Sequence, residues 1–116
     1  GHLTGDAVLA DFARVLRGVC ERGCLLSRYG GEEFLVVLPG HDTAMARSLA
    51  ETIRAETRGR EVMAEDGTPV SYTVSVGVAQ GGEEEAVGAL LSRVDQALYQ
   101  AKEGGRDLVA EATCDG

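Results

Sequence analysis

The sequence has no tryptophan and few other aromatic residues, which together make up 4% of its 116 residues. Proteins that hold single-stranded nucleic acid commonly stack its bases on aromatic rings, so this scarcity argues against that class. Basic residues are outnumbered by acidic ones, and the formal net charge is −8. A surface of this sign repels nucleic acid and anionic membranes. A ligand that carries phosphate would therefore need a metal ion or a local cluster of basic side chains.

Cysteines are also few, and long apolar runs are missing. The three cysteines are Cys20, Cys24 and Cys114, and no histidine or cysteine spacing typical of zinc accompanies them. We therefore expect ordinary thiols in a reducing compartment. No run approaches the roughly 20 apolar residues of a membrane span. The polar start GHLTGD is unlike a signal peptide, so the sequence predicts a cytoplasmic location with no membrane span in this segment.

Apolar spacing predicts a mixed α/β domain. Three amphipathic helices are predicted, over residues 6–21, 43–58 and 87–103. Short strands are predicted over residues 25–29, 33–38, 62–64, 69–72, 74–79 and 108–109, the first four as two hairpins. This order indicates an α/β sandwich with helices packed on a sheet. A βαβ arrangement would begin with a strand before the first helix, whereas this chain begins at the helix.

The predicted hairpin tip carries two adjacent glycines followed by two adjacent carboxylates, Gly30-Gly31-Glu32-Glu33. Neighbours on a regular strand point to opposite faces, so Glu32 and Glu33 can serve one site only where that alternation breaks. Glycine tolerates positive φ and leaves room for a ligand to approach the backbone. Paired carboxylates suit a hard divalent cation. A solvated turn whose charges protect a sheet edge is the alternative.

Two further polar groups have an ordinary and a functional interpretation. Lys102 and Arg106 close the third helix, where cations complement the helix dipole; beside the carboxylates they would bind phosphate. Asp6 could cap the first helix, or could accept hydrogen bonds from the edge of a guanine base. Tyr99 lies at helical spacing with apolar neighbours and is expected in the core.

Together these motifs resemble the GGDEF diguanylate cyclase family. The family pattern contains GHxxGD, RxGGDEF or RxGGEEF, SxGxA, and ADxALYxAKxxGRN. This chain has GHLTGD at residues 1–6, RYGGEEF at 28–34, SVGVA at 75–79, and DQALYQAKEGGRD at 95–107. The resemblance therefore covers nearly the whole chain, with residues 1–110 as one N-terminally truncated domain and residues 111–116 as a tail.

The resemblance implies a fold and a chemistry. The fold would be a palm-type, ferredoxin-like two-layer sandwich with a mixed, largely antiparallel sheet, here lacking its first strand. Two GTP molecules would condense to cyclic di-GMP and pyrophosphate between two antiparallel copies of the domain. Glu32 would ligate Mg²⁺ or Mn²⁺, and Glu33 would help with the metal or with deprotonation of the 3′-hydroxyl. Lys102 and Arg106 would bind the terminal phosphates, and Asp6 would contact guanine.

The sequence also departs from the family pattern. Glu21 and Cys24 stand where many members carry an inhibitory Arg-x-x-Asp motif, so product feedback there is not expected. The family domain begins some tens of residues earlier, with a metal-binding Asp and a guanine-reading Asn. We therefore expect this chain alone to be inactive or nearly so. A GTP-binding or dimerising regulatory module is the alternative function, and a purely structural α/β fragment is a third. A fused sensory or receiver domain is expected in the parent protein.

Overall fold

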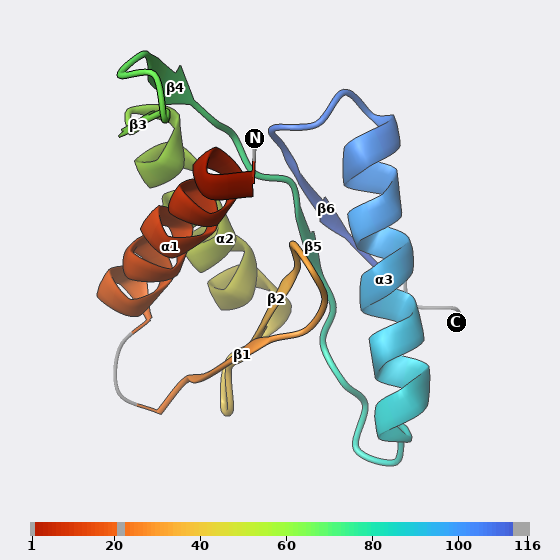
Figure 1. Ribbon diagram of the computed structural model, residues 1–116. Coiled ribbons are helices and arrows are strands. Elements are labelled where there is room, and N and C mark those ends of the chain that lie inside the picture. Colours follow the sequence, from red (N-terminus) through yellow and green to blue (C-terminus); the bar gives the residue numbers. More distant parts are fainter. Residues whose placement is uncertain (1, 21–22, 113–116) are drawn as a thin grey trace. The chain divides into compact units, whose positions relative to one another are not determined.

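The computed structural model describes residues 2–20 and 23–112, and the chain forms two compact units, which we describe separately. The first unit joins Gly1–Gly40 to Ala55–Tyr72, and the second joins His41–Arg54 to Thr73–Gly116. Within the described residues, three helices alternate with six short strands (Figure 1). The alternation of helices and strands is that predicted from the sequence, and the strands pair two by two.

The first unit contains one long helix and two antiparallel hairpins. Its elements are α1 (His2–Val19), the hairpin of β1 (Leu25–Arg28) and β2 (Phe34–Val37), and the hairpin of β3 (Glu61–Met63) and β4 (Pro69–Ser71). In the first hairpin Arg28 pairs with Phe34, so the five residues between them form the connecting loop. In the second, the side chain of Asp66 accepts a hydrogen bond from the Thr68 backbone at 3.0 Å, which closes the turn.

An aromatic cluster and a buried carboxylate connect α1 to the strands of this unit. The ring of Phe12 lies edge-on to Phe34, with centroids 5.4 Å apart, and to Tyr72 at 6.4 Å. Asp11 is only 6% exposed. It accepts two hydrogen bonds from the Arg60 guanidinium and one from the Tyr72 hydroxyl, each at 2.7 Å. The bond from Arg60, assisted by Tyr72, lowers the pKa of Asp11 to about 2 against the opposing effect of burial.

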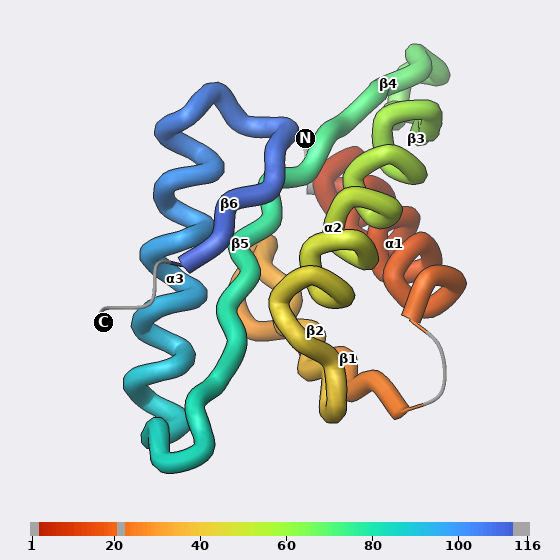
Figure 2. Tube along the Cα trace, turned by 180° about the vertical axis from the view of Figure 1, so that it is seen from behind, coloured from red at the N-terminus to blue at the C-terminus, as the bar shows by residue number. Residues whose placement is uncertain are grey.

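The second unit is a strand–helix–strand arrangement that also includes most of α2. Its elements are α2 (Thr43–Arg58, as far as Arg54), β5 (Val76–Val78), α3 (Val87–Glu103) and β6 (Val109–Glu111). The two strands are parallel and lie side by side in Figure 2, as a helical crossover requires. A core of aliphatic side chains holds the unit together: Ala46, Ala50, Val76, Val78 and Val109.

Helix α3 packs directly against the backbone of β5. A Cβ atom on Gly77 would lie 2.4 Å from the backbone nitrogen of Leu98 and 2.8 Å from the carbonyl oxygen of Val94. Such a distance is shorter than any real contact of a Cβ atom, so only glycine permits this approach. The close packing of α3 on β5 therefore explains why the SVGVA motif has glycine at residue 77.

Helices α2 and α3 have the predicted ends, and the first five strands lie within two residues of their predicted bounds, whereas other predictions need correction. Helix α1 begins at His2, so Asp6 lies inside the helix and the interpretation of Asp6 as its cap is wrong. The last strand begins at Val109 instead of residue 108. The side chain of Tyr99 is 64% exposed, so the expectation of a core tyrosine is wrong. The predicted tail begins too early, because Glu111 belongs to β6; residues 113–116 of that tail, with Cys114, lie outside the described residues, as does Glu21. None of the helices in the described part combines the length and apolar character needed to cross a membrane.

Candidate functional site

The loop between β1 and β2 is held in a defined shape by its own backbone and by one arginine. The backbone nitrogens of Tyr29 and Gly30 both donate to the carbonyl oxygen of Glu33, at 2.8 and 3.2 Å. Arg28 donates from Nε to the carbonyl of Gly30 at 3.4 Å and from Nη2 to the carbonyl of Gly31. Sequence reasoning gave Arg28 no role, although its place two residues before the glycine pair was a usable signal. Arg28 and the loop backbone together fix the positions from which the side chains of Glu32 and Glu33 project.

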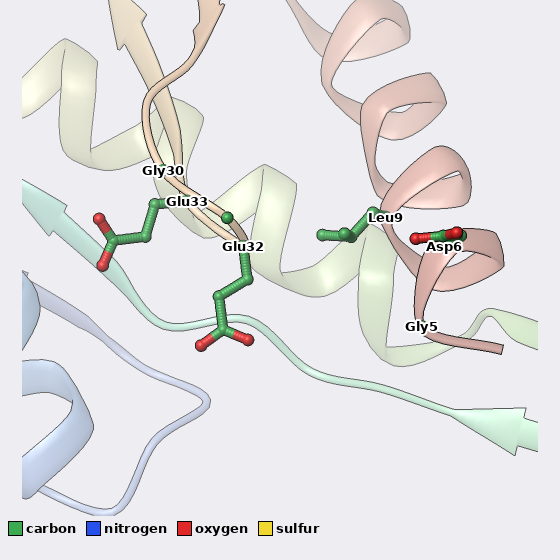
Figure 3. A pocket seen from close by; sticks show the side chains of 7 residues that line it. Gly5, Asp6, Leu9, Gly30, Glu32 and Glu33 are labelled. Atoms are coloured by element: carbon green, nitrogen blue, oxygen red, sulfur yellow. The ribbon is translucent and has the colours of Figure 1, made fainter. Parts of the chain in front are cut away.

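This loop and the start of α1 line one open pocket of about 790 Å³. Its lining residues are Gly5, Asp6, Leu9, Gly30, Gly31, Glu32 and Glu33. Figure 3 shows Asp6 and Leu9 on α1 at one side and the two glutamates on the loop at the other. The structure therefore brings together three of the five predicted site residues, from motifs more than twenty residues apart in the chain.

The donor chemistry of the pocket fits a divalent cation that also binds substrate. Glu32 is exposed and Glu33 half-buried, and Figure 3 shows their side chains leaving the loop in different directions. Among the residues that the structure describes, no three acidic, histidine or cysteine side chains gather as a complete ligand set. Mg²⁺ does not require one, because it is usually bound by one or two carboxylates, with water and substrate phosphates completing its octahedron. Glu32 and Glu33 would be those carboxylates, and this role stays a prediction.

The glycine pair is not explained by backbone conformation. Neither Gly30 nor Gly31 has a positive φ, so the tolerance of glycine for that region is not what the loop uses. A Cβ on Gly31 would meet nothing within 4 Å, and one on Gly30 would only touch the Glu33 side chain at 3.5 Å. The fold itself therefore has space for side chains here. Room for a ligand against the backbone therefore stays a prediction, as does the alternative of a solvated turn at the sheet edge.

The two predicted basic residues belong to the second unit. Lys102 is half-buried in the last turn of α3, and Arg106 is exposed in the turn that follows. Asp6, Glu32 and Glu33 belong to the first unit. The convergence of the acidic and basic groups on a single ligand stays a prediction.

The described cysteines are free thiols, as expected from the sequence. Cys20 and Cys24 are both half-buried, and neither forms a disulfide. Burial, together with the neighbouring Cys24, raises the pKa of the Cys20 thiol. Cys20 is therefore protonated at neutral pH and is a weak nucleophile.

Comparison with known proteins places the chain in a family. The family described as "Diguanylate cyclase, GGDEF domain" matches residues 1–108. The chain is 44% identical over 112 residues to the diguanylate cyclase DgcM of Escherichia coli K12, covering 97% of this chain and 26% of that protein. It is 43% identical over 113 residues to the response regulator PleD of Caulobacter vibrioides, covering 94% and 24%. The chain thus spans about a quarter of the length of these relatives.

Solved structures agree with the sequence comparison and with the predicted fold class. The GGDEF domain of DgcB from Caulobacter crescentus, solved in complex with c-di-GMP, has a TM-score of 0.91 at 34% identity, over 97% of this chain and 67% of that one. The active GGEEF domain of a diguanylate cyclase from Vibrio cholerae has a TM-score of 0.84 at 30% identity, over 99% and 72%. The α/β palm-like fold is confirmed by these structures, and the chain belongs to the GGDEF diguanylate cyclase domain family.

Proposed function

We propose that this chain is the larger part of a diguanylate cyclase domain that condenses two GTP molecules to cyclic di-GMP and pyrophosphate. The observation that supports it best is the acidic pocket of the first unit. There, residues from the GHxxGD and RxGGEEF motifs line one space although they are distant in sequence. The family match over residues 1–108 supports this reaction class.

Each site residue has a role in this proposal. Glu32 and Glu33 would hold Mg²⁺ or Mn²⁺, which supplies the positive charge that a triphosphate needs on an acidic domain. Asp6, exposed on the pocket wall, would accept hydrogen bonds from the guanine edge. Lys102 and Arg106 would bind the terminal phosphates, and Arg106 offers a planar, permanently charged donor.

The reaction would require two copies of the domain. Each copy would hold one GTP, and the 3′-hydroxyl of each nucleotide would attack the α-phosphate of the other, releasing pyrophosphate twice. The hydroxyl proton would pass to Glu33 or Glu32, and the two carboxylates are alternatives for this step. The domain would work in the cytoplasm, where GTP is available, joined to a sensory or receiver domain.

A second candidate function is a regulatory module that binds GTP or dimerises without catalysis. Residues 1–116 span 72% of the active GGEEF domain from Vibrio cholerae, so the isolated chain and the parent chain can differ in activity. We expect residues 1–116 alone to turn over little or no GTP, because the metal-binding and guanine-binding residues that the family carries upstream are not among them.

Two measurements on the same samples separate these functions. The parent chain, meaning the natural polypeptide that carries residues 1–116, and the isolated chain 1–116 are each incubated with GTP and Mg²⁺, and the products are separated by liquid chromatography. The cyclase proposal expects cyclic di-GMP from the parent chain and little from the isolated chain. Tight binding of a fluorescent GTP analogue by the parent chain, without any product, would support the regulatory module. Full activity of the isolated chain would refute the expected need for the upstream segment.

A further inference from the structure

The turn that follows α3 has an unusual backbone. Gly105, Arg106 and Asp107 have consecutive positive φ values of 120°, 62° and 49°. The helix end itself is a Schellman motif, in which the nitrogen of Arg106 donates to the carbonyl of Ala101 at 3.0 Å and that of Gly105 to Lys102 at 3.4 Å. That motif needs a left-handed residue only at Gly105. The left-handed conformations of Arg106 and Asp107 are therefore additional, and something outside the helix end must maintain them.

A side chain of α2 holds this turn from the same unit. The Nη1 atom of Arg54 donates to the carboxylate of Asp107 at 3.2 Å and to its backbone carbonyl at 3.3 Å. Arg54 is itself fixed by Glu51, whose Oε2 accepts from Nε and Nη2 at 3.1 and 2.9 Å. The side chains of Arg54 and Asp107 are only 22% and 26% exposed. The guanidinium therefore bridges α2 and the backbone of the residue next to Arg106.

We propose that Arg54 is a positioning residue that fixes the left-handed backbone at Asp107 and thereby aims Arg106 at the terminal phosphates of GTP. The inference rests on the proposed function, which gives Arg106 its ligand. Its physical basis is the shared peptide unit: the torsions at Arg106 and Asp107 set the direction of the Arg106 side chain. If Asp107 relaxes to negative φ, the exposed Arg106 side chain is carried away from its direction in this structure.

The identity of residue 107 agrees with this role. Aspartate and asparagine adopt the left-handed region more readily than other side chains except glycine. The family pattern has asparagine at this place, and this chain has aspartate, which adds a negative charge opposite the Arg54 guanidinium. Asp107 therefore favours the left-handed backbone and carries a charge opposite to that of Arg54.

The test measures GTP binding by the parent chain in Mg²⁺, using a fluorescent GTP analogue, with guanosine as a ligand that lacks phosphates. We expect Arg54→Ala to raise the Kd for GTP about tenfold, as loss of charge-assisted contacts does, and to leave guanosine binding unchanged. Arg106→Ala should do the same. The double variant should be no weaker than Arg106→Ala alone, because Arg54 acts only through Arg106. Asp107→Asn should retain affinity to within about twofold, since it keeps both an acceptor and the backbone preference.

A matched control distinguishes positioning from a general effect of removing an arginine from α2. Arg47 lies on the same helix and forms an ion pair with Glu111 of β6 at 3.0 Å, so Arg47→Ala should leave the Kd for GTP unchanged. Asp107→Ala is the second test variant, used if Arg54→Ala does not fold, and it should weaken GTP binding as Arg54→Ala does.

The outcomes separate the inference from the function on which it rests. If Arg106→Ala weakens GTP binding and neither Arg54→Ala nor Asp107→Ala does, the positioning role is refuted while the proposed function stands. Additive losses in the double variant would also refute it. If Arg106→Ala itself has no effect, the phosphate contact assigned under the proposed function has failed.

Discussion

Replacing Asp11 should remove the buried polar contacts that connect α1 to Arg60 and Tyr72 within the first unit. Asp11 is 6% exposed and accepts three hydrogen bonds of 2.7 Å, two from Arg60 and one from Tyr72. Breaking a fully buried ion pair from one side destabilises a protein by about 3–5 kcal/mol. The Arg60 side chain is 39% exposed and can regain water, so we expect about 2–3 kcal/mol for Asp11→Ala at pH 7.

The pKa of Asp11 supplies an independent magnitude and a pH window. A carboxyl with a pKa of about 2 in the folded chain and 3.8 as its ordinary value contributes about 2 kcal/mol to stability at neutral pH. Because the folded pKa is the lower one, this contribution is fully present above the ordinary value and is lost as pH falls through about 2. The isosteric variant Asp11→Asn should therefore be less stable than the wild type at pH 7 and approach it in stability near pH 2.

Urea denaturation followed by circular dichroism at several pH values between 7 and 2 measures this difference. The wild type and Asp11→Asn are compared at each pH, so that other acid-sensitive groups cancel. Glu84→Gln, at an exposed glutamate, is the control and should follow the wild type throughout. A constant difference between the wild type and Asp11→Asn from pH 7 to pH 2 would refute the reasoning, as would a difference near zero at pH 7.

Two further predictions concern the second unit. Gly77→Ala should destabilise the chain by about 1–3 kcal/mol in urea denaturation, because the added Cβ would clash with the backbone of α3. Gly88→Ala is the control: its Cβ would meet nothing within 4 Å, so this variant should be neutral or slightly stabilising. Equal effects of the two substitutions would contradict the packing argument. The hydrogen bonds from Arg93, both 2.8 Å, lower the pKa of Glu85 to about 2, so Glu85→Gln should reduce the loss of stability on acidification from pH 5 to pH 2. If Glu85→Gln loses as much stability as the wild type between pH 5 and pH 2, the Glu85–Arg93 pair does not contribute to this pH dependence.

Local signals in the sequence were enough for the two later helices but not for the first. The side chain of Asp42 accepts from the backbone nitrogen of Met45 at 2.8 Å, as an N-cap does, and α2 begins at Thr43 as predicted. The same kind of signal misled at α1, where Asp6 suggested a start although the helix already includes it. A cap-type residue marks the start of a helix only when the residues before it are not helical. The sequence around Asp6 does not show whether they are.

The pocket could be predicted because its residues belong to recognisable motifs, whereas the contacts around them could not. Asp6 and the Glu32-Glu33 pair line one pocket, whereas their roles toward guanine and the metal ion stay predictions. Arg54 and Asp107 lie 53 residues apart, and no periodicity or spacing relates a mid-helix arginine to a distant turn. Their contact depends on how α2 and the end of α3 come together within the second unit, and only the structure supplies that.

In the proposed function, the carboxylates of the hairpin loop take part directly in GTP cyclisation. The most direct test quantifies cyclic di-GMP formed from GTP and Mg²⁺ by the parent chain, by its Glu33→Gln variant, and by Glu84→Gln as a control. We expect product from the wild type and from Glu84→Gln. Glu33→Gln should lose at least about a hundredfold, because it removes a group that positions charge or takes a proton. Undiminished product from a folded Glu33→Gln variant, or no product from the wild type, would contradict this proposal.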